Sequence, residues 1–518
     1  MTNNVFRSRS SSGMQLTCLA LVMSAISTMS TLAGAHPAVA AEATIRNGVF
    51  WKDTGGAPIY SQGGGILKIG AKYYWYGVKY AEAVTYARAP GAITGQPHFS
   101  AATAYSSTDL VNWTFEGDVL TPGGLGAHFD PQAWLGRMGV VYNARTRKYV
   151  LLTQYSSKAT GGGVLFATSD SPAGPFTFAR LQARIDNVAS PTSGDQTVFI
   201  DDDGQPYLIF SSNGDRRQLY VARLRAADFL AVEPATHIYS APAGGREGNA
   251  MFKHDGLYYF CSSDLHGWNA SRSFYMTSPN ITGPYTPEKL IEGTEADFSH
   301  VSQNGFFIPV QGSAATTVLY AGDRWSNFAG NGHGYNIWTP LSFDGAAPRF
   351  NSLSEFTFDA ARGTWAVGKG NNYLRNPGFE ADRVRQTGVA GWTSSWTSIK
   401  GDAPIMNIRD GRTGNWALAL RHAGQTMGSA IQNVTLPNGT YTLKAWAKGS
   451  GGQRVARLFA AGHGGATMAL PLQGAMAQWT EVTLPGIPVD SGSVQIGVYS
   501  EGKDGDWLSV DDFSLVRE

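Results

Sequence analysis

Cysteine is scarce in this sequence, which contains only Cys18 and Cys261 among its 518 residues. Cys18 lies in an N-terminal segment that we expect to be removed, so no internal disulfide can form in the mature chain. Charged residues are also sparse: they make up 15% of the chain, and the formal net charge is +1. This balance gives no electrostatic basis for binding nucleic acid or an anionic membrane, and we expect neither partner.

Long hydrophobic runs are absent except near the N-terminus. Arg7 and Arg9 precede an apolar run over residues 16–32, and residues 38–40, Ala-Val-Ala, come after it. This order is typical of a secretory signal that is cleaved after its last small residue. We therefore predict a signal peptide at residues 1–40 and a secreted mature protein, extracellular or periplasmic, without a membrane partner after cleavage.

Aromatic residues and glycine, in contrast, are abundant. The chain has 14 Trp, 22 Tyr and 63 Gly. This composition is typical of many short strands joined by tight turns. Aromatic rings also pack against the apolar faces of sugars, so the composition is compatible with sugar binding.

One pattern returns five times, with copies that begin near residues 66, 139, 197, 250 and 306. Each copy has alternating apolar residues, a Gly or charged turn, and a second Tyr-rich alternation, which predicts a β-hairpin. In most copies a further strand ending in Ser or Thr, a turn and an aromatic residue follow. Two hairpins make a four-stranded blade, so the repeat predicts a five-bladed β-propeller rather than independent β-sandwiches.

The repeat stops near residues 368–372, and a different pattern follows. Alternating strands such as Tyr441–Trp446 and Val494–Tyr499, separated by Gly-rich turns, favour a β-sandwich. We predict an all-β protein with a five-bladed propeller over residues 42–366 and a jelly-roll β-sandwich over residues 371–518.

In a propeller the innermost strands begin around one axis, so the residues just before each hairpin converge on a shared pocket. These positions are Gln62, the segment Asp130–Gly136, Asp195, Glu247 and Gln303. Three of the five positions offer a carboxylate. For Glu247, which follows Arg246, an ion pair at the strand end is the alternative to a catalytic acid whose proton affinity its neighbours control.

Residues 48–366 resemble glycoside hydrolase family 43, whose fold is a five-bladed propeller. The motifs that carry this resemblance are Gly194–Thr197 ahead of Asp201–Gly204, Arg246-Glu247 before the fourth hairpin, and the repeated Ser-Asp…Gly-Pro-Phe units. The resemblance implies a secreted, inverting glycoside hydrolase that acts on plant-type polysaccharides and needs no cofactor for catalysis.

Two further similarities refine this expectation. The opening segment Asn47–Thr54 and the segment Gly322–Trp325 are similar to the branch of the family that contains exo-β-1,3-galactanases. Residues 371–518, with Asn376–Glu380 and Val510–Asp512, resemble a jelly-roll carbohydrate-binding module. The first expectation is exo-action on β-1,3-galactan. The alternatives are an α-L-arabinofuranosidase or β-xylosidase, and a carbohydrate-binding propeller without catalysis.

The family resemblance assigns roles to two carboxylates. It implies that Glu247 is the general acid and that Asp195 modulates the pKa of that acid. Electrostatics agrees, because a nearby anion makes Glu247 harder to ionise. A non-catalytic sugar binder would gain nothing from two mutually repelling carboxylates, which favours an enzyme.

The catalytic base departs from the general family pattern, because Gln62 stands where a first-blade Asp is usual. The galactanase branch also lacks that Asp, and its fifth-blade Gln is thought to act through an imidic-acid tautomer, which points to Gln303 as the water-positioning group or base. The same branch has a Glu before Arg in blade two, where this chain has Gly136-Arg137. Asp130, which enters the same rim, is the alternative base.

Further polar and aromatic residues are candidates for binding substrate at the rim. They are Gln62, Arg324, Trp268, His266 and His300. Trp268 either stacks on a sugar ring or packs between blades. Arg324 either binds a sugar hydroxyl or pairs with Asp195 or Glu247. The histidines lack metal-ligand spacing and are expected to be polar pocket groups.

In the C-terminal region four Trp residues are candidate platforms for sugar stacking, and at least half are expected in the core: Trp392, Trp396, Trp416 and Trp479. The resemblance to a carbohydrate-binding module also allows a structural calcium near Glu380 and Asp512.

Overall fold

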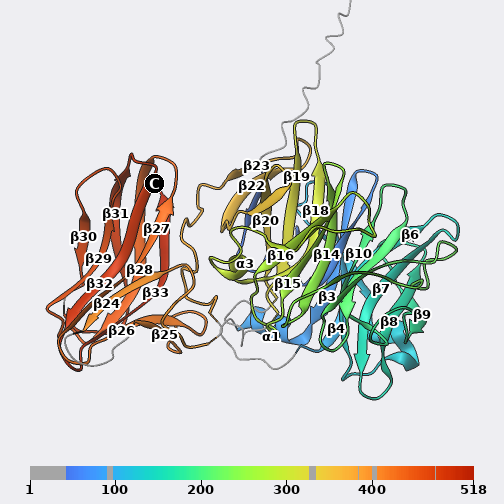
Figure 1. The fold of residues 1–518 in the computed structure, drawn as a ribbon, viewed down its shortest axis with the longest axis horizontal. Coiled ribbons are helices and arrows are strands. Elements are labelled where there is room, and N and C mark those ends of the chain that lie inside the picture. Colours follow the sequence, from blue (N-terminus) through green and yellow to red (C-terminus); the bar gives the residue numbers. More distant parts are fainter. Residues whose placement is uncertain (1–42, 90–96, 326–333, 383, 399–404, 473) are drawn as a thin grey trace, which may run out of the picture. The chain divides into compact units, whose positions relative to one another are not determined.

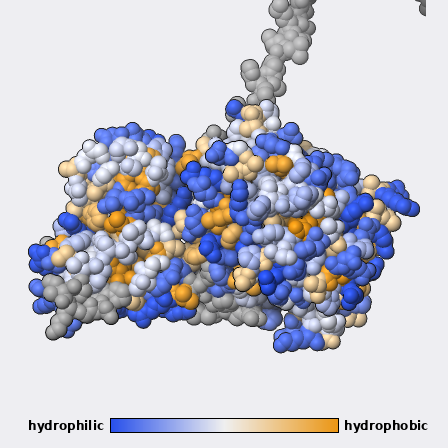
Figure 2. Space-filling model, viewed as in Figure 1, coloured by the Kyte–Doolittle hydropathy of each residue, from blue (hydrophilic) through white to orange (hydrophobic). Residues whose placement is uncertain are grey.

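The computed structural model describes residues 43–89, 97–325, 334–382, 384–398, 405–472 and 474–518. The predicted signal peptide lies outside these residues. Within the described parts of the chain, no helix is both long and apolar enough to cross a membrane. The face shown in Figure 2 is largely hydrophilic, with hydrophobic residues in small separate groups.

Five four-stranded antiparallel sheets form the blades of a propeller (Figure 1). Blade one contains β2 (Gln62–Ile69), β3 (Lys72–Tyr80), β4 (Phe99–Ser107) and β5 (Thr114–Leu120). Blade two contains β6 (Trp134–Asn143), β7 (Lys148–Ser157), β8 (Gly161–Ser169) and β9 (Thr177–Gln182). Blade three contains β10 (Ser193–Ile200), β11 (Pro206–Ser212), β12 (Gln218–Arg223) and β13 (Thr236–Ser240). Blade four contains β14 (Arg246–His254), β15 (Leu257–Asp264), β16 (Ser273–Ser278) and β17 (Lys289–Leu290). Blade five contains β18 (Gln303–Gln311), β19 (Thr316–Asp323), β20 (Asn336–Asp344) and β21 (Ala347–Phe350).

The five blades close into a ring. Their inner strands β2, β6, β10, β14 and β18 contact one another in cyclic order, and β18 returns to β2. In a further three-stranded sheet the first strand, β1 (Ala43–Arg46), pairs with β22 (Glu355–Asp359), which in turn pairs with β23 (Thr364–Val367). The predicted five-bladed propeller is thus confirmed, because each Tyr-rich hairpin repeat forms the inner part of one blade.

Large aromatic side chains fill the space between blades one and five. Trp75, Trp113 and Trp338 are fully buried, with ring centroids 4.9 Å apart for Trp75 and Trp338 and 5.2 Å apart for Trp75 and Trp113. Burying a large apolar side chain contributes on the order of 1.5–3 kcal/mol. Three of the 14 Trp residues are therefore used for packing between these two blades.

The helices of the propeller are short: α1 (Ala81–Arg88), α2 (Pro122–Leu125), the 3-10 helix η1 (Gly126–His128) and α3 (Phe298–Val301). The last of these is a left-handed turn, because its four residues have φ angles of 49°, 55°, 56° and 55°. None is glycine. A left-handed helical conformation costs an L-residue about 1–2 kcal/mol, so contacts elsewhere in the fold must hold this turn.

The C-terminal region forms a β-sandwich of two five-stranded sheets. One sheet has the order β24 (Thr393–Ser398), β27 (Thr426–Thr435), β32 (Ser493–Gly502), β29 (Val455–Ala461) and β30 (Met468–Pro471). The other has the order β25 (Met406–Ile408), β26 (Ala417–Arg421), β33 (Trp507–Arg517), β28 (Gly439–Gly449) and β31 (Met476–Val489). Alternating apolar residues from both sheets form one core, as the sequence pattern predicts.

Most of the Trp residues proposed as stacking platforms belong to this core. Trp392 and Trp416 are buried in it, and Trp396 packs against it. Trp479 is half-buried, and the Lys448 ammonium lies 4.5 Å from its ring centroid. The expectation that at least half of these residues are structural is therefore confirmed.

Candidate active site

All five inner strands carry a β-bulge at the same end. The register with the neighbouring strand shifts between residues 62 and 65, 136 and 139, 193 and 196, 247 and 250, and 304 and 306. A bulge leaves a residue outside the ladder and re-aims its side chain. This repeated irregularity turns residues from different blades into one pocket.

The pocket has a volume of about 320 Å³. It is lined by Trp134, Arg137, Gln154, Tyr155, Ser156, Gly162, Thr192, Ser193, Asp195, Asn213, Arg216, Glu247, Gly267, Trp268, Gln303 and Trp325. Of the residues named from sequence, Asp195, Glu247, Gln303 and Trp268 are thus brought together. Binding pockets for small ligands begin at about this size.

Asp195, on β10, is held by two guanidinium groups and a backbone amide. Its Oδ2 lies 2.9 Å from Arg137 Nη2 and accepts a hydrogen bond from Gly248 N at 3.0 Å. Arg216 Nη1 pairs with Oδ1. Burial alone would raise the pKa of this carboxyl, but the charges of Arg137 and Arg216 outweigh burial and lower the pKa well below its usual range. Asp195 is therefore an anion at neutral pH.

Glu247, on β14, is buried in the opposite electrostatic situation. Its Oε1 accepts hydrogen bonds from Gln303 Nε2 at 2.6 Å and from His266 N at 3.4 Å. Burial first, and the charge of Asp195 second, raise the pKa of Glu247 above its ordinary value, although Arg216 and Arg137 oppose them. A carboxyl that keeps its proton near neutral pH is suited to general acid catalysis.

The neighbouring residue Arg246 does not pair with Glu247. Successive strand residues point to opposite faces, and the Arg246 guanidinium binds the Glu288 carboxylate and lies 4.2 Å from the ring centroid of Phe274. The alternative of an ion pair between Arg246 and Glu247 at the strand end is therefore wrong. The cations that face Glu247 come from Arg137 and Arg216 instead.

Gln303, the first residue of β18, connects the acid to a cation. Arg137 Nη2 donates to Gln303 Oε1 at 2.6 Å, while Gln303 Nε2 donates to Glu247. These two bonds define the orientation of the amide: its oxygen faces Arg137 and its nitrogen faces Glu247. One N–H and one oxygen lone pair of the amide remain for a water molecule or a sugar hydroxyl.

Sequence reasoning missed Arg137 and Arg216 as site cations. Arg137 lies within the bulge of β6 with φ of 53°, donates to Asn304 O at 3.0 Å and lies 4.7 Å from the Trp325 ring centroid. The blade-two segment expected to converge on the pocket, Asp130–Gly136, ends one residue before Arg137. Arg216 lies between β11 and β12, outside the strand starts, and carries no comparable signal.

Asp323, at the end of β19, is a buried carboxyl that sequence reasoning also missed. Its Oδ1 accepts from Gly63 N at 3.1 Å, and its Oδ2 has no hydrogen-bond partner among the described residues. Burial raises the pKa of Asp323 to about 7, against the opposing effects of Arg137 and Gly63 N. It does not line the pocket.

Five of the other predicted residues do not line the pocket either: Gln62, Asp130, Arg324, His266 and His300. Gln62 Nε2 donates to Arg324 O at 2.7 Å. Asp130 accepts from Gln132 N at 2.9 Å and from Ser157 Oγ. Arg324 Nε donates to Val301 O at 2.9 Å, and His300 Nδ1 lies 2.8 Å from Ser352 Oγ. These side chains are used in contacts with other parts of the propeller. His266 contributes its backbone amide to Glu247.

Three indole rings form one wall of the pocket. The centroids of Trp134 and Trp268 are 6.4 Å apart, and those of Trp268 and Trp325 are 5.8 Å apart. A Cβ atom on Gly136 would lie 2.5 Å from Cζ2 of Trp134 and 2.8 Å from Tyr80 Oη. The Trp134 ring thus fills the place of a side chain at residue 136, which explains why glycine stands there.

The proposed calcium ligands are partly engaged within the protein. Glu380 Oε1 accepts from Asn415 N and Trp416 N, both at 2.8 Å, while its buried Oε2 lacks a hydrogen-bond partner among the described residues. Asp512 accepts from Thr413 Oγ1 at 2.6 Å and pairs with Arg412 at 2.8 Å. The described residues contain no group of three or more His, Cys, Asp or Glu arranged to hold a metal ion. The structural calcium stays a prediction.

This prediction can be tested by thermal unfolding in calcium. A cation that binds only the folded sandwich would stabilise it by about 2.7 kcal/mol at a hundredfold excess over Kd. We expect the Tm to rise by several degrees with added Ca²⁺, and Glu380→Gln to remove the rise. A Tm that does not change between EDTA and millimolar Ca²⁺ would contradict a calcium site.

Comparison with known proteins agrees with this geometry. The family model for glycosyl hydrolases family 43 matches residues 66–335. The β-D-galactofuranosidase of Aspergillus niger is 28% identical over 215 residues, which cover 40% of this chain and 62% of that protein. An arabinoxylan arabinofuranohydrolase of Paenibacillus polymyxa is 27% identical over 209 residues, which cover 35% of this chain and 32% of that protein. The matches thus span less than two thirds of either relative.

Solved structures share the fold over nearly the whole chain. An exo-β-1,3-galactanase from Phanerochaete chrysosporium, solved with β-1,3-galactotriose, aligns with a TM-score of 0.56 at 24% identity, covering 92% of this chain and 100% of that chain. An exo-β-1,3-galactanase from Clostridium thermocellum aligns with a TM-score of 0.54 at 22% identity, with the same coverage. Since the family model spans more than half of the sequence, this chain belongs to glycosyl hydrolases family 43 and is a glycoside hydrolase.

Proposed function

We propose that this enzyme releases galactose from the ends of β-1,3-galactan with inversion at the anomeric carbon. The observation that carries the proposal is the 2.6 Å hydrogen bond from Gln303 to Glu247 inside the pocket. Gln62, which stands where a first-blade Asp is usual in the family, does not line this pocket. The site therefore pairs a carboxylic acid with a carboxamide. The fold shared with two exo-β-1,3-galactanases supports the same substrate.

The shape of the pocket supports exo-action. A cavity of about 320 Å³ walled by Trp134, Trp268 and Trp325 suits the end of a chain better than an internal segment. The rings offer apolar surface for a sugar face, while Asn213 and Gln154 offer polar groups in the pocket lining.

In the proposed reaction Glu247 donates its proton to the glycosidic oxygen as the bond to the anomeric carbon breaks. Water, positioned by Gln303, attacks that carbon from the opposite face and gives a proton to the nitrogen of the imidic-acid tautomer of Gln303. The O–H proton of that tautomer then leaves as the amide re-forms, and solvent returns a proton to the Glu247 carboxylate. An inverting pair needs a separation of about 6.5–9.5 Å. The hydrogen bond between Gln303 and Glu247 must therefore open when the substrate enters.

Product analysis tests the substrate. Purified protein is incubated with β-1,3-galactan, arabinan, arabinoxylan and a set of aryl glycosides. The proposal predicts single galactose residues from β-1,3-galactan and no product from the other polysaccharides. Release of arabinose or xylose instead would identify an α-L-arabinofuranosidase or β-xylosidase, a candidate that the furanose-acting relatives favour. Binding without any release would indicate a non-catalytic sugar binder.

We also propose secretion through the segment at residues 1–40. N-terminal sequencing of the protein recovered outside the cytoplasm should begin at Ala41. An intact N-terminus on a protein that stays in the cytoplasm would contradict the proposal.

The pH dependence of activity tests the role of Asp195. Glu247 must be protonated to act, so kcat/KM is expected to fall as the pH rises through the pKa of Glu247. The charge of Asp195 raises that pKa. Asp195→Asn should therefore move the alkaline limb to lower pH, by on the order of one unit. Asp170→Asn, at an exposed site paired with Lys148, is the control. An alkaline limb that stays in place in Asp195→Asn would show that Asp195 does not set this pKa.

A further inference from the structure

The left-handed turn α3 ends two residues before Gln303. Left-handed conformations outside glycine are uncommon and cluster where the surrounding structure fixes a functional site. Here four of them occur in succession, from Phe298 to Val301. The turn therefore sets the direction in which the chain enters β18 and presents Gln303.

Several hydrogen bonds hold the turn from within and from both sides. Asp297 Oδ1 accepts from His300 N and the Asp297 carbonyl accepts from Val301 N, both at 2.9 Å. Ser299 Oγ donates to Ser271 O at 2.7 Å. Arg324 donates to the carbonyls of Val301 at 2.9 Å and His300 at 3.2 Å. The unfavourable backbone is thus fixed by tertiary contacts.

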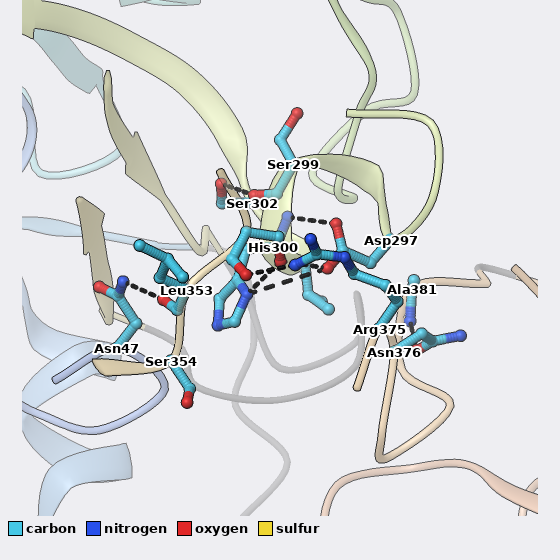
Figure 3. Close-up of polar contacts among 12 residues, drawn as sticks. Asn47, Asp297, Ser299, His300, Ser302, Leu353, Ser354, Arg375, Asn376 and Ala381 are labelled. Atoms are coloured by element: carbon cyan, nitrogen blue, oxygen red, sulfur yellow. Dashed lines mark hydrogen bonds and ion pairs between the residues drawn. The ribbon is translucent and has the colours of Figure 1, made fainter. Parts of the chain in front are cut away.

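A second set of bonds braces the carboxylate that holds the turn (Figure 3). His300 Nδ1 lies 2.8 Å from Ser352 Oγ, which donates to Asp297 Oδ2. Burial first, with nearby Arg324 and Arg375, lowers the pKa of His300 to about 4, although Asp297 opposes them. Since the hydroxyl hydrogen of Ser352 is used in the bond to Asp297, Nδ1 of the ring donates to Ser352 Oγ. Because the side-chain partner of the carboxylate is the serine hydroxyl and not the imidazole, which lies 3.9 Å away, this order differs from that of a nucleophilic triad. We call Asp297, Ser352 and His300 the brace, because together they hold the left-handed turn.

Arg375, which lies ahead of the sandwich strands, connects this brace to the sandwich. Its Nη1 donates to Ser352 O. Its own backbone is bound twice by Gln432 of β27: Arg375 N donates to Gln432 Oε1 at 2.7 Å, and Gln432 Nε2 donates to Arg375 O at 2.9 Å. A continuous set of contacts thus leads from β27 through Arg375 and Ser352 to the turn before Gln303.

We propose that Asp297 and Arg375 are positioning residues for Gln303, so that the C-terminal sandwich supports the catalytic site through the left-handed turn. This inference rests on the proposed role of Gln303 in catalysis. Neither residue lines the pocket. Their effect is on the orientation of the Gln303 backbone, which decides whether its side chain can leave Glu247 and face the attacking water.

The test compares kcat and KM for Arg375→Ala, Arg375→Lys and Asp297→Asn in the full chain. We expect Arg375→Ala to lower kcat about tenfold with KM within twofold, Arg375→Lys to restore most of the activity, and Asp297→Asn to lower kcat at least as much as Arg375→Ala. Arg421→Ala, an exposed arginine on β26, is the matched control and should leave both constants unchanged. Melting curves show whether each variant is folded at the assay temperature.

A double-mutant cycle separates positioning from general stability. In a Gln303→Ala background, Arg375→Ala should have no further effect on kcat, because the group that it positions is gone. If Arg375→Ala lowered kcat equally in the wild-type and Gln303→Ala backgrounds, this inference would fall while the proposed function would stand. A lower Tm with unchanged kcat would have the same consequence. If Gln303→Ala by itself kept full kcat, the proposed role of Gln303 and this inference would both fall.

Discussion

Glu247→Gln is expected to lower kcat on β-1,3-galactan by about 10²–10⁴-fold, the usual contribution of a general acid. The amide keeps the shape of the side chain and an oxygen that accepts from Gln303, but it has no acidic proton for the leaving oxygen. KM should change little because packing and hydrogen bonding of the ground state are retained.

The size of this loss should depend on the leaving group. An aryl glycoside with a strongly acidic phenol needs little protonation as it leaves, so Glu247→Gln should retain much of its activity on such a substrate. Glu292→Gln, an exposed glutamate near Arg349, is the control and should behave as wild type. Equal losses on aryl glycosides with acidic and weakly acidic leaving groups would contradict the assignment of Glu247 as the acid.

Gln303→Ala is expected to have the second largest effect, a loss in kcat of about 10²–10⁴-fold if Gln303 takes the water proton. Gln303→Glu should be more active than Gln303→Ala, because a carboxylate at this position can act as an ordinary base next to Arg137. The added anion beside Glu247 should also raise the pKa of the acid and move the alkaline limb of kcat/KM to higher pH.

Asp130 provides the comparison for this prediction, since the sequence offers it as the alternative base. Its carboxylate binds Ser157 and Gln132 N rather than a pocket group, so Asp130→Asn should cost much less than Gln303→Ala. The reverse order of losses, with Asp130→Asn the more damaging, would move the base to Asp130.

The propeller could be predicted because its signals are local. Alternating apolar residues and a Gly or charged turn define each hairpin over about ten residues, and five copies leave few other architectures. Because the inner strands of a propeller begin around one axis, the same pattern also placed Asp195, Glu247 and Gln303 in one pocket. These residues lie far apart in sequence but at equivalent strand starts.

The remaining site residues depend on geometry that the pattern does not contain. A shift of one residue along a strand moves a side chain to the other face, and the bulges introduce such shifts at the pocket. Gln62 therefore faces Arg324 O, whereas Arg137 faces Gln303. Arg216 enters from a loop between strands, which strand periodicity does not describe.

The left-handed turn could not be predicted either. Of its four residues only His is enriched at positive φ, and the contacts that hold the turn come from residues such as Asp297, Arg324 and Ser352. Its role as a support for Gln303 follows only from the three-dimensional arrangement.

The stereochemistry of the first product tests the central claim most directly. Proton NMR can follow the anomeric signals of galactose during the first minutes of reaction on β-1,3-galactan, before the anomers equilibrate. Direct attack of water on the face opposite the leaving group predicts that α-galactose appears first and that the β-anomer grows in later. Initial release of β-galactose would show retention through a covalent intermediate, and the proposed role of Gln303 in directing water at the anomeric carbon would then be wrong.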